Sequence, residues 1–443
     1  MDSSSKLADR LRSILNPAGA LCSPSQAPRA SDSDLERILG GRWQQQTNGA
    51  CFVVERRIGA HTMYGHDTVG ELALRLGVAA AEAPLLAGGA PARPPFLFFD
   101  LETTGLSGGA GTYAFLVGCA SFDEGGDFIT RQYVLLRFAD EGALLHAVTG
   151  ELARAGAIVS FNGKSFDAPV LETRYLFHRL DWVGAWLPHV DVLHPARRFW
   201  GNGGVRGPRD EHTSCSLVSL ERQVLGAERV RDVPGFEIPA RYFQFVRSGD
   251  ARPLAAVLEH NRLDLLSLAG VTARLVHLVR SGPEGTCDAR EALALGHVYA
   301  RAGLDGRARA AFSRAANASI SPVNGSMQGA PPIAGSAASI AAIRIDALRA
   351  LALTMRRGRQ YDEAAGCWRQ LLDVCGCPRH IAREATEALA IHHEHRARDL
   401  AAARAFALQS LESGMPAWKQ AAQHRLARIE RKMATARAPG LLS

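Results

Sequence analysis

The amino-acid sequence predicts an α/β domain, in which helices flank a mixed sheet, followed by an all-α region of repeated helices. Three strand-like apolar runs lie close together: FLFFD (96–100), TYAFLVGCASF (112–122) and FITRQYVLLRF (128–138). Short loops containing glycine separate them, as in antiparallel hairpins. The pattern then alternates between helix and strand, and from residue 287 the apolar period is helical to the end. Such an order indicates a sheet covered by helices, with a helical region after it.

The first ninety residues form an N-terminal region that we expect to be partly disordered. Residues 1–35 are rich in Ser, Pro, Ala and Asp, and residues 36–80 carry only weak strand and helix signals. The sheet domain is predicted over 91–282. After its three hairpin strands we expect, in order, a helix over 139–155, a strand over 157–161, a helix over 167–180, a strand over 188–194 and a long helix over 253–279.

The last third of the chain, residues 287–435, contains an internal repeat. Its apolar residues follow the spacing of a tetratricopeptide unit twice. The first copy comprises Leu295, Gly296, Tyr299, Ala308, Phe312 and Ala315, and the second comprises Leu351, Ala352, Met355, Ala364, Trp368 and Leu371. A stretch of small residues, 321–339, is predicted as a flexible insert between the copies. Such apolar stripes pack paired helices together, and the sequence does not identify what their concave face binds.

The charge of the chain is concentrated in its last third. The 443 residues have a formal net charge of +7, and after residue 282 there are 22 basic residues against 14 acidic ones. This balance permits a nucleic-acid partner. If the helical repeats contact phosphates, we expect truncation after residue 285 to weaken binding and to flatten its salt dependence. An unchanged salt dependence would instead indicate a protein partner for the repeats.

Composition also limits the compartment and the kinds of site. The sequence shows no secretory signal and no apolar run of membrane-spanning length, so we expect a cytoplasmic protein with no membrane partner. Of the eight cysteines only Cys375 and Cys377 are close together, and a single residue between them with no second pair is a poor zinc pattern. We interpret the cysteines as reduced thiols.

Two carboxylates follow the first strand-like run. Asp100 and Glu102 are two residues apart, so on a strand they point to the same side. Like charges held together raise each other's pKa unless a cation lies between them. Hard divalent ions such as Mg²⁺ and Mn²⁺ favour oxygen ligands. The pair therefore indicates half of a metal site.

Two further segments carry acids in comparable positions. In VSFNGKSFDAPVL a strand ends, Asn162 turns the chain and Asp167 opens a helix, where an ordinary N-cap is its alternative role. In EHNRLDLLSL, His260 and Asp264 are one helical turn apart and share a face. Asp264 lies in an apolar stretch, where an unpaired carboxylate is costly to bury and requires a partner.

Taken together, these segments resemble the DEDD (DnaQ-like) exonuclease superfamily, which has a ribonuclease H-like fold. The resemblance is most specific to the YprB-like branch of predicted bacterial exonucleases, whose relatives also carry tetratricopeptide-like helices after the domain. It covers about residues 95–280. The motifs that carry it are, in order, FDLETTGL, FNGKSFDAPVL, HVDVLHPARRFW, LVSLERQVLG, DVPGFEIPARYF and EHNRLDLLSLAG.

The resemblance implies a two-metal phosphodiesterase that releases nucleotides from a 3′ end. Asp100, Glu102, Asp167 and Asp264 would hold two Mg²⁺ or Mn²⁺ ions, and His260 would orient or deprotonate the attacking water. Histidine-type members place this residue five positions before the last Asp, whereas His260 is four positions before Asp264. Four residues are still about one helical turn, so the side chain can face the metals.

Four residues near these acids are candidates for contact with the terminal nucleotide, namely Thr103, Leu106, Asn162 and Phe166. Turn formation is the alternative role of Asn162, and core packing is that of Phe166. The glycine-rich stretch GLSGGAGT lacks the Lys-Ser/Thr ending of a phosphate-binding loop, which excludes nucleoside triphosphate binding of that type.

The leading hypothesis is a 3′–5′ exonuclease that acts on single-stranded DNA or RNA. The alternative is an adaptor that binds nucleic acid or protein without cleaving it. All four carboxylates are present, which favours the enzyme, because a disused site would tolerate Asn or Ser at those positions. The sequence distinguishes neither DNA from RNA nor exonucleolytic from endonucleolytic cleavage.

Overall fold

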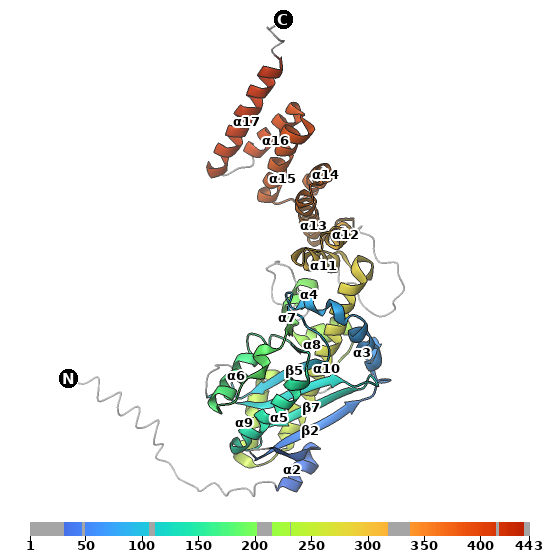
Figure 1. The fold of residues 1–443 in the computed structure, drawn as a ribbon, viewed down its shortest axis with the longest axis vertical. Helices are drawn as coiled ribbons and strands as arrows, with labels where there is room; N and C mark the ends of the chain where they lie inside the picture. Colours follow the sequence, from blue (N-terminus) through green and yellow to red (C-terminus); the bar gives the residue numbers. More distant parts are fainter. Residues whose placement is uncertain are drawn as a thin grey trace, which may run out of the picture.

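The computed structural model describes residues 31–46, 49–105, 111–201, 215–230, 232–317, 337–412 and 416–437. A sheet domain lies at one end of the molecule, and a stack of helices extends away from it (Figure 1). Leu106 lies outside the described residues, as does the predicted insert up to residue 336. The last three residues of that insert, 337–339, belong to a helix.

Seven strands form one mixed sheet in the order β1-β2-β7-β6-β5-β8-β9. The pairs β5–β8 and β8–β9 are parallel, and the remaining neighbours are antiparallel. The strands are β1 Arg42–Gln46, β2 Gly49–Ile58, β5 Phe96–Thr103, β6 Ala114–Phe122, β7 Phe128–Val134, β8 Ala157–Ser160 and β9 His189–Asp191, and β3 Met63–Tyr64 and β4 Asp67–Thr68 form a separate hairpin. This arrangement confirms the predicted mixed sheet.

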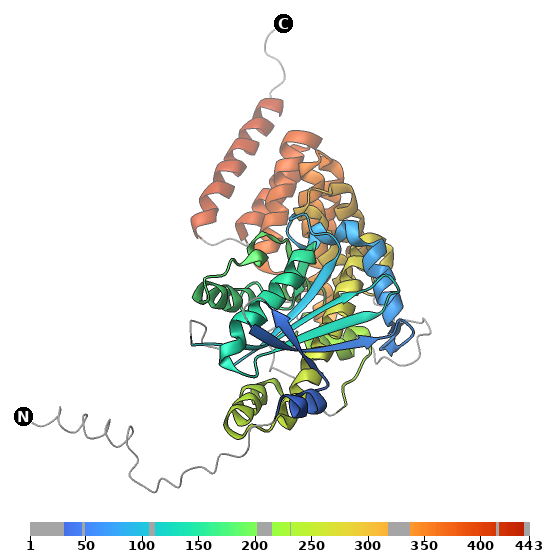
Figure 2. The ribbon, with the colours of Figure 1, turned by 60° about the horizontal axis from the view of Figure 1, so that its bottom comes forward.

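The sheet carries helices on both faces (Figure 2). Alternate residues of β5 belong to different clusters of the core: Phe96 and Phe98 pack on one face, and Leu97 and Phe99 pack on the other. Asp100 continues the first of these two series, so its side chain lies on the face covered by the long helix α10. The opposite face is covered mainly by α5 and α6.

The helices of the sheet domain match the predicted order. They are α2 Asp32–Leu39, α3 Val69–Val78, α4 Ala83–Leu86, α5 Glu141–Arg154, α6 Asp167–Phe177, α7 Leu193–Phe199, α8 Leu217–Leu220, α9 Ile238–Ser248 and α10 Arg252–Ser281. Short 3₁₀ segments are η1 Ala80–Glu82, η2 Phe138–Asp140, η3 Val183–Trp186, η6 Gly235–Glu237 and η7 Gly282–Gly285, and η5 Glu221–Leu225 is a π-helical turn.

The residues before the predicted domain also contribute to the sheet. β2 pairs with β7 along seven residues, and β1 pairs with β2 at the edge. Only β2 has a clear apolar run, whereas β1 reads RWQQQ and is mostly exposed. An edge strand of this polarity gives a weak sequence signal because it buries little.

The C-terminal region is all helical. It comprises α11 Ala289–Arg301, α12 Asp305–Asn317, α13 Ala337–Arg357, α14 Tyr361–Leu372, α15 Arg379–His392, the π-helical η8 His393–Ala397, α16 Leu400–Glu412 and α17 Pro416–Arg437. Each helix packs against the next one along the chain. Gly296 marks a close crossing of α11 and α12, because a Cβ atom there would lie 2.4 Å from the Phe312 ring.

Hydrogen bonds and ion pairs join the helical region to the sheet domain. The Tyr299 hydroxyl donates to the carbonyl of Val279 near the end of α10 (2.6 Å), and the Trp200 indole after α7 donates to Glu291 in α11 (2.9 Å). Among the described helices, none combines the length and the apolar character that a membrane crossing requires.

Candidate functional site

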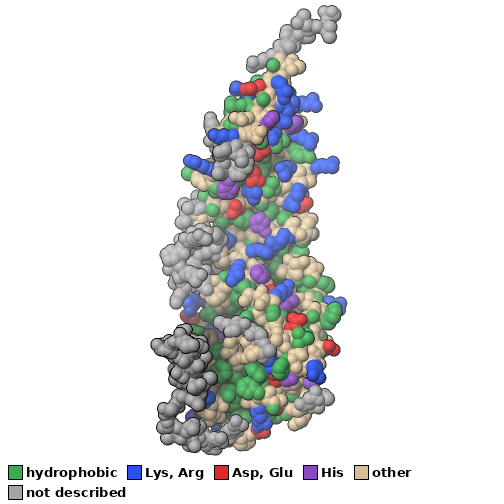
Figure 3. Space-filling view, turned by 90° about the vertical axis from the view of Figure 1, so that its left-hand side faces the viewer, with side chains coloured by type: hydrophobic (Ala, Val, Ile, Leu, Met, Phe, Trp, Pro, Cys, Tyr) green, Lys and Arg blue, Asp and Glu red, His purple; other side chains and the backbone are tan. Residues whose placement is uncertain are grey.

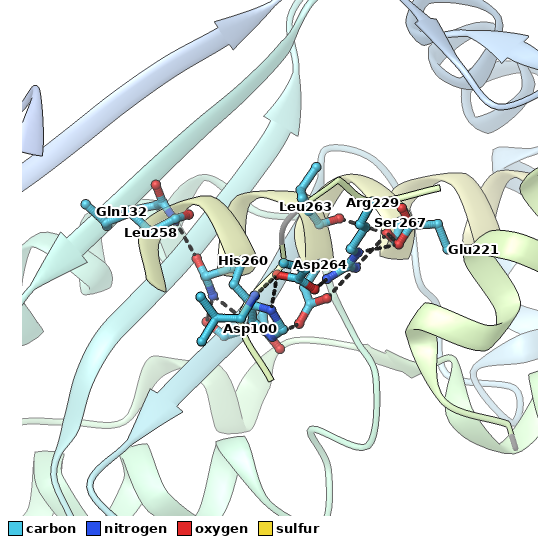
Figure 4. Close-up of polar contacts among 12 residues, drawn as sticks. Asp100, Gln132, Glu221, Arg229, Leu258, His260, Leu263, Asp264 and Ser267 are labelled. Carbon is cyan, nitrogen blue, oxygen red and sulfur yellow. Dashed lines mark hydrogen bonds and ion pairs between the residues drawn. The ribbon is translucent and has the colours of Figure 1, made fainter. Parts of the chain in front are cut away.

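The first candidate residues lie at the end of β5. The register of β5 and β6 shifts between Glu102 and Thr103, so the strand is irregular where its acids are presented. Asp100 accepts a hydrogen bond from the buried amide of Asn261 on α10 (2.7 Å), and Asn261 accepts one from Gln132 on β7 (2.8 Å), as Figure 4 shows in part. This chain of hydrogen bonds fixes the orientation of the Asp100 carboxylate.

A missing side chain makes room for this chain of hydrogen bonds. Gly118 on β6 lies under Asn261, and a Cβ atom there would come within 2.3 Å of the Asn261 side-chain oxygen. The glycine therefore allows α10 to approach the sheet at the level of Asp100.

Asp167 is the first residue of α6, but it does not cap the helix. The N-cap position is Phe166, and no side chain makes a capping hydrogen bond there. The residue is only 6% exposed. The ordinary N-cap interpretation is therefore wrong, and the burial of this carboxylate requires another reason.

The turn before α6 is held by a different acid. Asp191 at the end of β9 accepts hydrogen bonds from the backbone N–H groups of Asn162 (2.9 Å), Lys164 (3.1 Å) and Leu193 (3.1 Å). Asn162 has a φ of 69°, in the left-handed region that Asn tolerates in turns. Asp191 thus shapes the turn that presents Asp167.

His260 and Asp264 lie on the face of α10 that looks toward β5 (Figure 4). The Nδ1 atom of His260 is 2.7 Å from a carboxylate oxygen of Asp232, and its Nε2 atom is 3.3 Å from Asp264. The other oxygen of Asp264 accepts a hydrogen bond from Arg229 (2.6 Å). Both residues therefore have defined orientations, set by a loop that precedes α9.

The charges of the predicted acids act on one another. Burial raises the pKa of Asp100, and the neighbouring Asp264, Glu102 and Asp167 raise it further. Burial likewise raises the pKa of Glu102, with Asp264, Asp167 and Asp232 adding to the effect. Burial, followed by the charge of Asp191, raises the pKa of Asp167 to about 7. The fold thus brings Asp100, Glu102, Asp167 and Asp264 into one region of high negative charge.

The donor set fits a hard divalent cation in chemistry. Among the described residues, no hydrogen-bond donor pairs with the carboxylate of Glu102, which is half-buried, or with that of Asp167, which is buried. An unpaired carboxylate is costly to remove from water. Oxygen ligands of this kind suit Mg²⁺ or Mn²⁺. The side chains do not form a closed cage, since no three His, Cys, Asp or Glu residues within the described ranges lie close enough to hold an ion together.

The candidate nucleotide contacts have mixed surroundings. Thr103 is buried, and its hydroxyl donates to the carbonyl of Gly105 (3.0 Å). Asn162 is exposed and Phe166 is half-buried, both beside Asp167. Leu106 falls outside the described ranges. Their roles toward a substrate stay predictions.

Sequence reasoning missed several polar residues of this region, namely Asn261, Gln132, Asp232, Arg229 and Glu221. A signal existed for the first of these, because Asn261 is three residues before Asp264 on the same buried face of α10. Asp232 and Arg229 lie in or just before the motif DVPGFEIPARYF, but nothing in their spacing indicates an ion pair with a distant helix.

Comparison with known proteins finds a family match over the sheet domain. The family model of the ribonuclease H superfamily matches residues 97–276. That range contains nearly all of β5, the turn before α6 and most of α10. The sheet domain is ribonuclease H-like. A protein of Bacillus subtilis (strain 168) named "Uncharacterized protein YprB" is 35% identical over 204 residues, which are 45% of this chain and 46% of the relative. The chain therefore spans less than half the length of this curated relative.

Proposed function

We propose that this protein is a metal-dependent nuclease of the DEDD type, which removes nucleotides from the 3′ end of single-stranded DNA or RNA. The observation that carries the proposal is that β5, α6 and α10 present four carboxylates to one region, where no hydrogen-bond donor among the described residues pairs with Glu102 or Asp167. Members of the ribonuclease H superfamily are generally nucleases, which supports the reaction class. The 3′ direction rests on the family resemblance.

Asp100, Glu102, Asp167 and Asp264 would hold two Mg²⁺ or Mn²⁺ ions. When bound, such ions acidify a water and stabilise the charge that develops on the phosphate oxygens. The chain supplies the orientation of the ligands. Asn261 donates to one oxygen of Asp100 and leaves the other oxygen available, and the irregular end of β5 directs Glu102 toward the same region.

His260 would orient the attacking water or accept its proton. Asp232 holds the Nδ1 atom at 2.7 Å, so the Nε2 atom is the nitrogen that faces Asp264. A carboxylate on one ring nitrogen fixes the orientation and tautomer of an imidazole. His260 is four residues before Asp264, where histidine-type relatives have five, and a ring nitrogen of His260 still points at the Asp264 carboxylate.

The helical region would extend the binding surface. We propose that it consists of tetratricopeptide-like repeats over 287–435, after a catalytic domain over 91–282. Lys and Arg side chains recur along one face of this region, where acidic side chains are fewer (Figure 3). Charge of this sign suits a nucleic-acid strand, and an acidic protein surface is the alternative partner of the helices. The seven described cysteines are free thiols, which is compatible with a cytoplasmic protein.

The test uses purified protein with single-stranded DNA and RNA oligonucleotides labelled at the 5′ or the 3′ end. With Mn²⁺ or Mg²⁺, a 5′ label should give a ladder of shortening products, and a 3′ label should be released at once as mononucleotide. The Asp100→Asn and Glu102→Gln variants should be inactive. Equal cleavage by wild type and both variants would refute the proposal, and internal cuts would replace the exonuclease by an endonuclease.

The second candidate is a non-cleaving adaptor for nucleic acid or protein. The observation in its favour is the hydrogen bond between Arg229 and Asp264, which supplies this ligand with a cation from the protein itself. An adaptor would bind the oligonucleotides with the same affinity whether EDTA or Mn²⁺ is present, and it would not shorten them.

A further inference from the structure

A buried arginine, Arg229, contacts both the proposed metal ligand Asp264 and Asp232, the carboxylate that holds His260. The three nitrogens of the Arg229 guanidinium reach three different carboxylates: Nε donates to Glu221 (2.6 Å), one terminal nitrogen to Asp232 (3.0 Å) and the other to Asp264 (2.6 Å) (Figure 4). Its side chain is 4% exposed. A guanidinium buried to this extent cannot contact the phosphates of a bound substrate. Any role of Arg229 in the reaction must therefore act through the carboxylates that it contacts.

One partner of Arg229 is a fixed anchor. Glu221 starts the π-helical turn η5, and its carboxylate also accepts a hydrogen bond from Ser267 on α10 (2.7 Å). The Ser267 hydroxyl is in turn 2.7 Å from that of Tyr64. Ser267 lies three residues after Asp264, so the anchor is attached to the same helix as the ligand.

The other two partners are the residues that the reaction would use or their direct support. Asp264 is a proposed metal ligand, and Asp232 is the carboxylate that holds His260. Arg229 contacts one oxygen of each of these acids. The second oxygen of Asp232 contacts the Nδ1 atom of His260, and the second oxygen of Asp264 lies 3.3 Å from the Nε2 atom of the same ring. The orientations of a ligand and of the histidine thus depend on one guanidinium.

We propose that Arg229, anchored by Glu221, is a positioning residue that sets both the metal-binding orientation of Asp264 and the orientation of His260. The inference rests on the proposed nuclease function. The planar fork of arginine is essential to it, since the contacts run from three nitrogens in three directions. A lysine has one ammonium on a flexible stem and cannot make all three contacts at once.

The experiment compares wild type with Arg229→Met, Arg229→Lys and Glu221→Gln. Mn²⁺ affinity and stoichiometry are measured by electron paramagnetic resonance, and kcat and KM are measured with a single-stranded oligonucleotide. Residues that orient metal ligands typically change metal affinity or activity by about 10–100-fold. We expect a loss of about that size in Mn²⁺ affinity and in kcat for both Arg229 variants, with KM changed less than about threefold. Glu221→Gln should give a smaller loss of the same kind.

The matched control is Arg75→Met. Arg75 makes a two-pronged ion pair with Asp67 in the same domain, away from the acids, so its loss should leave Mn²⁺ affinity unchanged. Thermal unfolding in EDTA establishes that each variant is folded, and Glu221→Gln carries the test if the Arg229 variants are not.

The outcomes separate this inference from the proposed function. Wild-type affinity and kcat in Arg229→Met, or full rescue by Arg229→Lys, would overturn the positioning role while the nuclease proposal stands. A wild-type protein that neither binds Mn²⁺ nor cleaves any oligonucleotide would refute both.

Discussion

Replacing Asp167 by Asn should make the metal-free protein more stable. The Asp167 carboxyl is buried without a donor among the described residues, and burial followed by the charge of Asp191 raises its pKa from 3.8 to about 7. The folded protein therefore holds this proton more tightly than the unfolded chain does. Consequently the free energy of unfolding falls as the pH rises from about 4 to about 7, and it stays low above that range.

The magnitude follows from the same shift. Each pKa unit corresponds to about 1.4 kcal/mol, so the ionised carboxylate of Asp167 costs the fold about 4 kcal/mol at pH 8. Asparagine resembles the protonated acid in shape and carries no charge. Asp167→Asn should thus raise the free energy of unfolding by up to about 4 kcal/mol at pH 8, and the gain should shrink toward zero near pH 4.

Urea denaturation in EDTA at pH 8 and at pH 4 measures this difference, and the same titration with Mn²⁺ tests the site. Mn²⁺ should stabilise wild type more than the variant, because a ligand that binds only the folded state shifts the equilibrium toward it. Asp191→Asn is the control, since this neighbouring carboxylate accepts three backbone hydrogen bonds and its loss should destabilise the protein. A variant Asp167→Asn no more stable than wild type at pH 8 would refute the reasoning.

Three further predictions concern the support of the site and the C-terminal region. Glu141→Ala leaves the buried Arg174 without its carboxylate partner and should lower the free energy of unfolding by about 3–5 kcal/mol in urea denaturation; a loss below 1 kcal/mol would contradict this. Gly118→Ala should displace Asn261, cost about 1–3 kcal/mol and lower kcat, and unchanged kcat would show that Asn261 does not orient Asp100. The side chain of Glu394 is buried, and a hydrogen bond from Arg428 on α17 lowers its pKa from 4.5 to about 2. The stability that this ion pair contributes is complete above about pH 4.5 and should be lost as the pH falls toward 2. Limited proteolysis with pepsin near pH 2 should therefore release α17 first.

The sheet could be predicted from local pattern because its central strands are strongly apolar. FLFFD and the two runs after it form β5, β6 and β7, and the period of two residues puts Asp100 on the face of Phe98. The strand-turn-helix pattern also placed Asp167 at the start of α6. These features depend on residues close together in the sequence, so their signal is local.

The arrangement of the candidate site depends on contacts between segments that are far apart in the sequence. Whether Asp167 approaches Asp100 is decided by the parallel pairing of β5 with β8, which local periodicity does not specify. The chain is rich in arginine, and no local pattern indicates that Arg229 is the one buried against Asp264. The N-cap interpretation of Asp167 failed for a related reason. An Asp near a helix start indicates a cap, but α6 begins at Asp167 itself, so the N-cap position falls on Phe166.

The core of the protein does not end where the predicted catalytic domain ends. One hydrophobic cluster runs from Phe98 on β5 through Leu275 on α10 to Leu295 on α11, Phe312 on α12 and Trp368 on α14. α10 carries Asp264 in its first half and the packing surface for α11 in its second half, roughly 22 Å further along the helix at 1.5 Å per residue. Truncation after residue 285 would therefore expose apolar core and disturb the helix that holds Asp264. A loss of nucleic-acid binding in such a fragment would not show that the helical region contacts phosphates. Neutralising exposed arginines of the helical region in the intact chain tests that contact without removing the support of the site.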